Sequence, residues 1–199
     1  MIETDRAPHA RDPTARFGEH ADMRELLLLR HAKSSWSTAG LADHERPLNA
    51  RGRAAADLMG RWCARVGMLP DLVRSSDAVR TRETVERWRD AAEWHGPVEW
   101  SSELYHAAPA TLLDAARTAP NTARRVMIVA HNPGLEELAS ALAGREIIHP
   151  TGTLSVFRAE LDHWRDLDHA VFREVHVWRP RDLTDQMSSA LPDDGDGDD

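Results

Sequence analysis

The chain has 199 residues, enough for one domain with a sizeable core, and its 41% hydrophobic and 29% charged residues are typical of globular proteins. Its formal net charge of −8 argues against a general nucleic-acid binder, because the phosphate backbone attracts basic surfaces. The longest apolar runs, residues 26–29 and 126–130, are too short to span a bilayer. With Cys63 as the single cysteine, no internal disulfide can form, and we expect a cytoplasmic location without membrane partners.

The two ends of the chain differ in composition from its middle. Residues 1–22 mix prolines and charges without periodicity or an apolar stretch, so we expect a poorly ordered extension rather than a secretory signal. Residues 192–199 contain five aspartates and no cation, which leads us to predict an acidic, disordered tail over residues 182–199. One folded domain is therefore predicted over residues 23–181.

Between these ends, short apolar runs alternate with helical stretches, a pattern that predicts an α/β domain with a mostly parallel sheet. Strands are expected over residues 25–30, 71–75, 98–100, 125–130, 153–160 and 171–178. Helices are expected over residues 50–66, 78–94, 109–118 and 134–143. Asn49 is predicted to cap the first helix and Gly67 to end it. Apolar residues recur every four positions in this helix and predict its buried face: Ala54, Leu58, Trp62 and Val66.

Three segments at the ends of predicted strands carry residues suited to phosphate chemistry. Residues 29–33 read Leu-Arg-His-Ala-Lys, residues 76–84 read Ser-Asp-Ala-Val-Arg-Thr-Arg-Glu-Thr, and residues 129–134 read Val-Ala-His-Asn-Pro-Gly. Parallel strands end at one edge of a sheet, where these loops could converge.

The converging loops would supply two histidines and two arginines: His31, His131, Arg30 and Arg80. Arginine meets the phosphoryl group with a planar fork of donors, and imidazole can hold that group covalently. Because the sequence shows no carboxylate cluster or closely spaced histidine pair, we expect neither a metal nor another cofactor.

In this order, the three segments resemble the histidine phosphatase superfamily. Arg-His-Ala-Lys-Ser-Ser-Trp at residues 30–36, Arg-Pro-Leu-Asn-x-x-Gly at 46–52 and His-Asn-Pro-Gly at 131–134 are similar to the SixA-type phosphohistidine phosphatases. The resemblance implies a three-layer α/β/α sandwich of the phosphoglycerate mutase-like kind, with the site at the carboxyl edge of the sheet. It also implies a nucleophilic His31 and a phosphate pocket, which contains Arg30, Arg80 and His131.

The general acid and the remaining substrate contacts stay open. Larger relatives supply a glutamate from an insertion after the second helix, and Glu103 is the nearest counterpart in this chain. Asp43 and Glu45 are alternatives, as is the absence of any general acid. Arg46 either orders its loop or guides the substrate, and Asn132 is a further candidate for substrate binding.

The resemblance, together with these residues, implies a metal-independent phosphatase with a phosphohistidine intermediate, acting on phosphohistidine in a protein. The imidazole of phosphohistidine leaves readily once protonated, so a weak general acid would suffice. Residues 94–109 are too few for a helical cap, so we expect a shallow, solvent-open pocket around His31 and His131, which favours a protein substrate. A phosphatase or mutase for a small metabolite and an inactive phosphate-binding module remain alternatives. The natural substrate and the oligomeric state stay undetermined.

Overall fold

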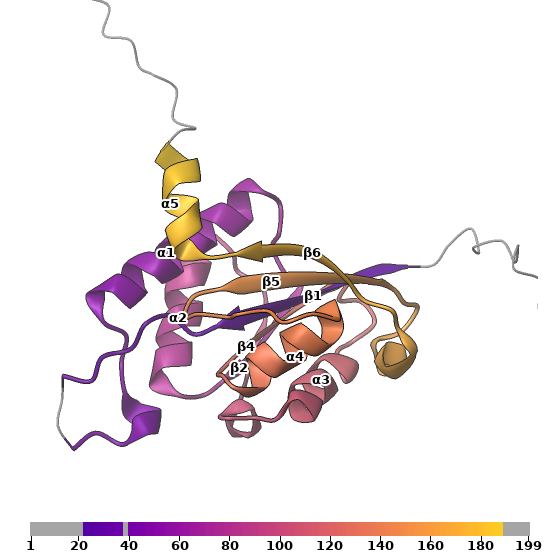
Figure 1. Cartoon of the computed structure of the whole chain (residues 1–199), viewed down its shortest axis with the longest axis horizontal. Helices are drawn as coiled ribbons and strands as arrows, with labels where there is room; N and C mark the ends of the chain where they lie inside the picture. Colours follow the sequence, from indigo (N-terminus) through magenta and orange to yellow (C-terminus); the bar gives the residue numbers. More distant parts are fainter. Residues whose placement is uncertain (1–21, 38–39, 189–199) are drawn as a thin grey trace, which may run out of the picture.

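A computed structural model describes residues 22–37 and 40–188 of the chain. Residues 1–21 and 189–199, for which we predicted poor order, lie outside the described residues. The described residues form a six-stranded sheet with the strand order β3-β2-β4-β1-β5-β6 (Figure 1). The strands are β1 (Met23–Arg30), β2 (Leu72–Ser76), β3 (Val98–Ser101), β4 (Arg125–Ala130), β5 (Leu154–Glu160) and β6 (Arg173–Trp178).

Strand directions decide which loops can meet. The pairs β1–β4, β4–β2 and β2–β3 are parallel, and β5 is antiparallel to both β1 and β6. The mostly parallel sheet predicted from the sequence is therefore confirmed. Because β6 runs in the same direction as β1, the chain leaves β1, β2, β4 and β6 at one common edge.

Helices cover both faces of the sheet (Figure 1). One face carries α1 (Ala50–Arg65), α2 (Val79–Ala91) and α5 (Pro180–Ser188), and the other carries α3 (Pro109–Arg117), α4 (Gly134–Ala143) and the 3-10 helix η3 (Trp164–His169). Alternate residues of β1 belong to the two cores, with Leu27 and Leu29 on the first side and Leu26 and Leu28 on the second. The predicted three-layer sandwich is thus confirmed. Within the described residues, no helix is long and apolar enough to cross a membrane.

The buried face of α1 differs from the prediction. Asn49 does cap the helix, since its side chain accepts a hydrogen bond from the Gly52 N–H. The predicted face, however, is exposed at Ala54 and Val66 and only half-buried at Leu58 and Trp62. The buried residues are instead Gly52, Ala56, Met59, Gly60 and Cys63. Counting large apolar side chains misplaced this face, because α1 packs closely through small residues.

The carboxyl end of the domain also differs from the prediction. The chain continues past residue 181 as α5, whose Leu183 is fully buried in the core on the α1 side of the sheet. The predicted tail over residues 182–199 therefore begins too early. The acidic composition belongs to residues 192–199, whereas Leu183 packs the preceding helix α5 against the core.

Gly60→Ala tests the close packing of α1 against α2. A Cβ atom at Gly60 would lie 2.3 Å from the Trp88 carbonyl oxygen. We expect overpacking to destabilise the protein by about 1–3 kcal/mol, even though alanine favours a helix over glycine by about 1 kcal/mol. Urea unfolding measures the change, with Ala64→Gly at an exposed position of α1 as the control. A Gly60→Ala variant more stable than the wild type would contradict this packing.

Candidate active site

The carboxyl edge of the sheet brings the predicted histidines together. His31 follows β1 and His131 follows β4, and their ring centroids lie 5.0 Å apart. Arg80, in the first turn of α2, donates a hydrogen bond from Nε to His31 Nε2 at 3.3 Å. The convergence expected from the sequence is therefore found for these three residues.

A backbone hydrogen bond sets the tautomer of His31. Its Nδ1 lies 2.8 Å from the carbonyl oxygen of Ala32, which can only accept, so Nδ1 carries the proton. The Nε2 atom is consequently unprotonated, and its electron pair accepts the hydrogen bond from Arg80. The Ala32 N–H donates in turn to Thr84 Oγ1, and Thr84 donates to the Arg80 carbonyl. This chain of bonds fixes the histidine loop to α2.

His131 is held by the end of β2. Its Nε2 lies 2.9 Å from Ser76 Oγ, while its buried Nδ1 has no hydrogen-bond partner in the described part of the chain. Ser76 Oγ also accepts from the Ala78 N–H. Ser76 belongs to the segment at residues 76–84, but the sequence alone did not predict its contact with His131.

Both imidazoles are neutral in the folded protein. Burial, followed by the repulsion of Arg80 and Arg30, lowers the pKa of His31 to about 3, although its bond to Ala32 opposes the shift. Burial and the neighbouring His31 lower the pKa of His131 to about 2. A neutral His31 is the form with a nucleophilic nitrogen at physiological pH.

Side chains from two short turns cover the histidines. Asp43, in the 3-10 helix η1 (Asp43–Glu45), accepts hydrogen bonds from Arg80 at 2.9 Å, Arg46 at 2.7 Å and the Tyr105 hydroxyl at 2.7 Å. The rings of Tyr105 and His106 lie 5.2 and 5.3 Å from that of His131.

The expectation of a solvent-open pocket is therefore wrong. His31 is 8% exposed and His131 is 2% exposed. Residues 94–109 do lack a helical cap, because they contain only β3, the 3-10 helix η2 (Ser102–Leu104), connecting loops and the first residue of α3. The two residues after η2, Tyr105 and His106, nevertheless reach the histidine pair and close part of the space.

The candidate general acids are separated by the fold. Glu103 is exposed and lines another cavity, of about 360 Å³, with Arg74 and Thr118, and among the described residues no hydrogen bond or ion pair joins its side chain to the histidines. Glu45 is exposed on η1. Asp43 reaches the site, but the hydrogen bond from Tyr105, together with Arg46 and Arg80, holds the pKa of its carboxyl well below the usual range. Asp43 is therefore a carboxylate and not a proton donor.

The remaining predicted residues border the histidine pair. Arg30 donates from Nη1 to the His149 carbonyl at 2.9 Å, and its buried Nε has no partner among the described residues. Asn132 donates to the same carbonyl and to Glu136. Arg46 donates to the Ser35 carbonyl and to Ser34 Oγ, as expected of a residue that orders its loop. Within residues 22–37 and 40–188, no group of three potential ligands is placed to hold a metal ion.

The geometry agrees with the similarity of the chain to known proteins. The sequence model of the histidine phosphatase superfamily (branch 1) matches residues 26–105. An uncharacterized chloroplastic protein of Arabidopsis thaliana is 35% identical over 157 residues, which cover 72% of this chain and 70% of the relative. The chain belongs to the histidine phosphatase superfamily.

Solved structures show which members of the superfamily this chain resembles. A candidate phosphohistidine phosphatase SixA from Nakamurella multipartitia superposes with a TM-score of 0.68 and 28% identity, covering 79% of this chain and 96% of its own. A candidate SixA from Agrobacterium tumefaciens superposes with a TM-score of 0.67 and 30% identity, covering 79% of this chain and 98% of its own. The protein is thus a phosphohydrolase of the SixA type. A mycobacterial glucosyl-3-phosphoglycerate phosphatase shares the fold at a TM-score of 0.52 and 16% identity, with coverages of 78% and 99%.

Neutral buried histidines predict a loss of stability in mild acid. Burial also lowers the pKa of His149 to about 3. Below about pH 6.5 the unfolded chain binds protons that folded His31, His131 and His149 do not, so each should cost about 1.4 kcal/mol of unfolding free energy per pH unit. Urea unfolding between pH 7 and 5 measures this slope.

His149→Gln should reduce the slope by about a third, since it removes one of three similar titrations. The same substitution at exposed His95 is the control. An unfolding free energy that stays constant from pH 7 to 5 would contradict the neutral state of the three buried rings.

Proposed function

We propose that the protein hydrolyses phosphohistidine on a protein substrate through a covalent phospho-His31 intermediate. One observation supports the mechanism above the others. The neutral His31 has an unprotonated Nε2, which accepts a hydrogen bond from Arg80 and lies beside the ring of His131. A nucleophile and a guanidinium thus lie within hydrogen-bond distance of each other, and a phosphoryl group carrying dispersed negative charge would bind beside both.

In the proposed reaction, His31 Nε2 attacks phosphorus in line with the bond to the substrate nitrogen. The new P–N bond forms as the old one breaks, and the substrate imidazole leaves with the electron pair of that bond and its ring proton. Arg30, Arg80 and His131 hold the equatorial oxygens. Water then attacks phospho-His31, releasing inorganic phosphate and regenerating the neutral imidazole. These steps require no metal ion.

Asp43 and a bound anion would compete for Arg80. In the free protein Asp43 accepts from Arg80 through both its backbone carbonyl and its carboxylate. A phosphoryl group would compete for the same guanidinium, so Asp43 is expected to move off Arg80 when substrate binds. Its bonds to Arg46 and Tyr105 offer alternative partners for the displaced carboxylate.

The ionised state of Asp43 supports phosphohistidine as the substrate class. An alkoxide leaving group from a phosphate ester needs protonation, whereas a protonated imidazole leaves as a neutral ring. Asp43 is ionised and Glu103 lies at another cavity, so the site is better suited to phosphohistidine. Similarity to candidate SixA structures at 28% and 30% identity supports the same class.

One observation favours a second candidate, a small phosphorylated metabolite. The low exposure of His31 and His131 beneath Tyr105 and His106 gives walls that could surround a small substrate. Side-by-side turnover of a phosphohistidine peptide and a panel of phosphorylated metabolites distinguishes the two substrate classes.

His31→Asn tests the nucleophile directly. The amide cannot accept a phosphoryl group stably, so both turnover and acid-labile labelling by radioactive phosphohistidine peptide should disappear. Arg80→Ala retains the nucleophile and should lower kcat by about 10²–10³, as does the loss of a transition-state donor. All reactions contain a chelator. Labelling of the His31→Asn variant, or turnover that depends on added magnesium, would contradict the mechanism.

Asp43→Asn distinguishes an anionic competitor from a general acid. If the carboxylate only occupies Arg80, the variant should bind tungstate more tightly and retain turnover of a phosphohistidine peptide. Inhibition constants and kcat are measured on that peptide and on a phosphoserine peptide, with exposed Asp162→Asn as the control. A selective loss of phosphoserine hydrolysis would instead identify Asp43 as the acid and favour ester substrates.

A further inference from the structure

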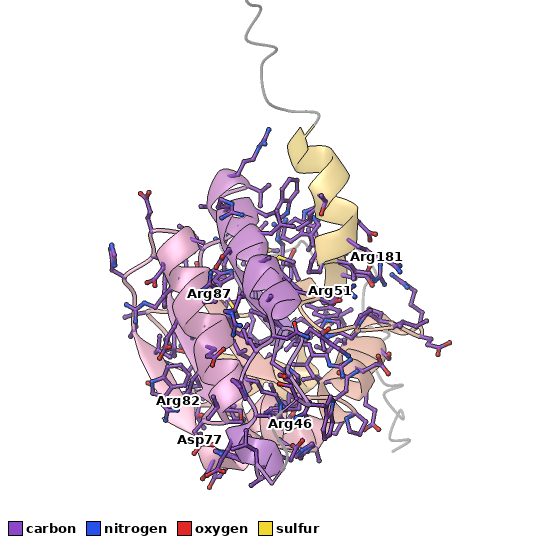
Figure 2. All side chains as sticks on the ribbon, turned by 90° about the vertical axis from the view of Figure 1, so that its left-hand side faces the viewer. Arg46, Arg51, Asp77, Arg82, Arg87 and Arg181 are labelled. Carbon is purple, nitrogen blue, oxygen red and sulfur yellow. The ribbon has the colours of Figure 1, made fainter. Side chains whose placement is uncertain are left out.

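A basic groove lies next to the histidine pair at the same edge of the sheet. It encloses about 130 Å³ between the start of α1, the loop before β5 and the start of α5. Its cations are Lys33, Arg51, Arg179 and Arg181, and no acidic residue lines it. Figure 2 shows Arg51 on α1 and Arg181 on α5, on one side of the molecule.

The topology connects this groove to the nucleophile. Lys33 lies two residues after His31, and the Gly152 N–H donates to the carbonyls of both Arg30 and His31. Gly152 has a φ of +80°, and a Cβ there would lie 2.9 Å from Pro180 Cγ. This glycine therefore lets the start of α5 approach the nucleophile loop closely.

Two features of the groove indicate that it binds an anion. Thr153 is fully buried in its lining, and its hydroxyl has no hydrogen-bond partner among the described residues. The side chains of Lys33 and Arg51 likewise make no ion pair within the described part of the chain. Arg179 and Arg181 share one exposed carboxylate, Asp182, at 3.9 and 3.1 Å. The positive ends of the α1 and α5 dipoles reinforce this field.

We propose that this groove binds the carboxylates of an acidic peptide segment that flanks the phosphorylated histidine of the substrate protein. The inference rests on the proposed function and extends it to the sequence around the target residue. Three of the four cations, Lys33, Arg51 and Arg181, are exposed and spread over separate elements. Such spacing suits several carboxylates along a chain, whereas a second phosphate would call for clustered, buried arginines such as Arg80.

The test compares two phosphohistidine peptides that differ only in three flanking aspartates replaced by asparagine. Phosphoimidazole reports activity without a peptide. For the wild type in low salt we expect kcat/KM about tenfold higher for the acidic peptide, from a few exposed ion pairs. This preference should vanish near 1 M salt, where the Debye length is about 3 Å.

The variant Arg51→Glu/Arg181→Glu should lose the preference while turning over phosphoimidazole normally. The control Arg61→Glu/Arg165→Glu makes the same charge change at exposed positions outside the groove and should retain the preference. If both variants lost the preference for the acidic peptide equally, or if neither lost it, the assignment of the groove would be overturned. So would a stronger dependence on the groove for bisphosphorylated metabolites than for the acidic peptide.

The five aspartates of residues 192–199 are a second possible occupant. A full-length variant with these aspartates replaced by asparagine should keep the preference for the acidic peptide. If the charge reversal affects only the chain with its native tail, the groove binds the tail and the proposal fails. Turnover of phosphoimidazole without any peptide preference overturns the groove assignment alone. No turnover of either peptide or of phosphoimidazole overturns the proposed function.

Discussion

The hydrogen bond between His31 Nδ1 and the Ala32 carbonyl determines what the rest of the site can do. It places the ring proton on Nδ1 and leaves Nε2 unprotonated, so that Nε2 accepts from Arg80 and can act as the nucleophile. Burial then keeps that nitrogen unprotonated, because a charged imidazole would lose its hydration without gaining a carboxylate partner. Without this arrangement, the guanidinium beside His31 would face either a second cation or an N–H group.

The sheet topology makes this arrangement possible. The parallel strands β1, β2 and β4 deliver His31, Ser76 and His131 to one edge, and Ser76 orients the second imidazole. The same edge receives the end of β6, so the cations at the start of α5 lie beside the nucleophile loop. A single topological feature thus explains both the phosphoryl site and the basic groove next to it.

The sequence predicted those parts of the site that depend on local patterns. His31 and His131 each directly follow a continuous apolar strand, and parallel strands end at one edge, so their meeting could be inferred. The neutral state of both rings depends on burial, which no spacing reveals. The side chains that cover both rings include Asp43 and Tyr105, which are hydrogen-bonded although they lie 62 positions apart in the chain. Asp43 belongs to the short 3-10 helix η1, and Tyr105 directly follows η2. Neither turn has a periodic pattern that predicts where its side chains point.

The difference between local patterns and contacts formed only in the folded chain also explains the errors in the predicted fold. The six strands and the helices α1 to α4 followed from apolar runs and from end signals such as Asn49. The buried face of α1 did not, because Gly52 and Gly60 pack through their lack of a side chain. Glu103 was placed at the site by its position in the chain, but the turn at η2 directs the following residues, Tyr105 and His106, toward His131 instead.

The central claim is that His31 is a neutral imidazole with its proton on Nδ1 and an unprotonated Nε2. Nitrogen-15 NMR of ring-labelled protein, recorded from pH 8 to 4, measures both the tautomer and the protonation of each histidine. The account predicts that the His31 signals retain the Nδ1–H pattern throughout this range, since burial lowers its pKa to about 3. Protonation of His31 with a midpoint near pH 6.5, or a proton on its Nε2 at neutral pH, would contradict the account.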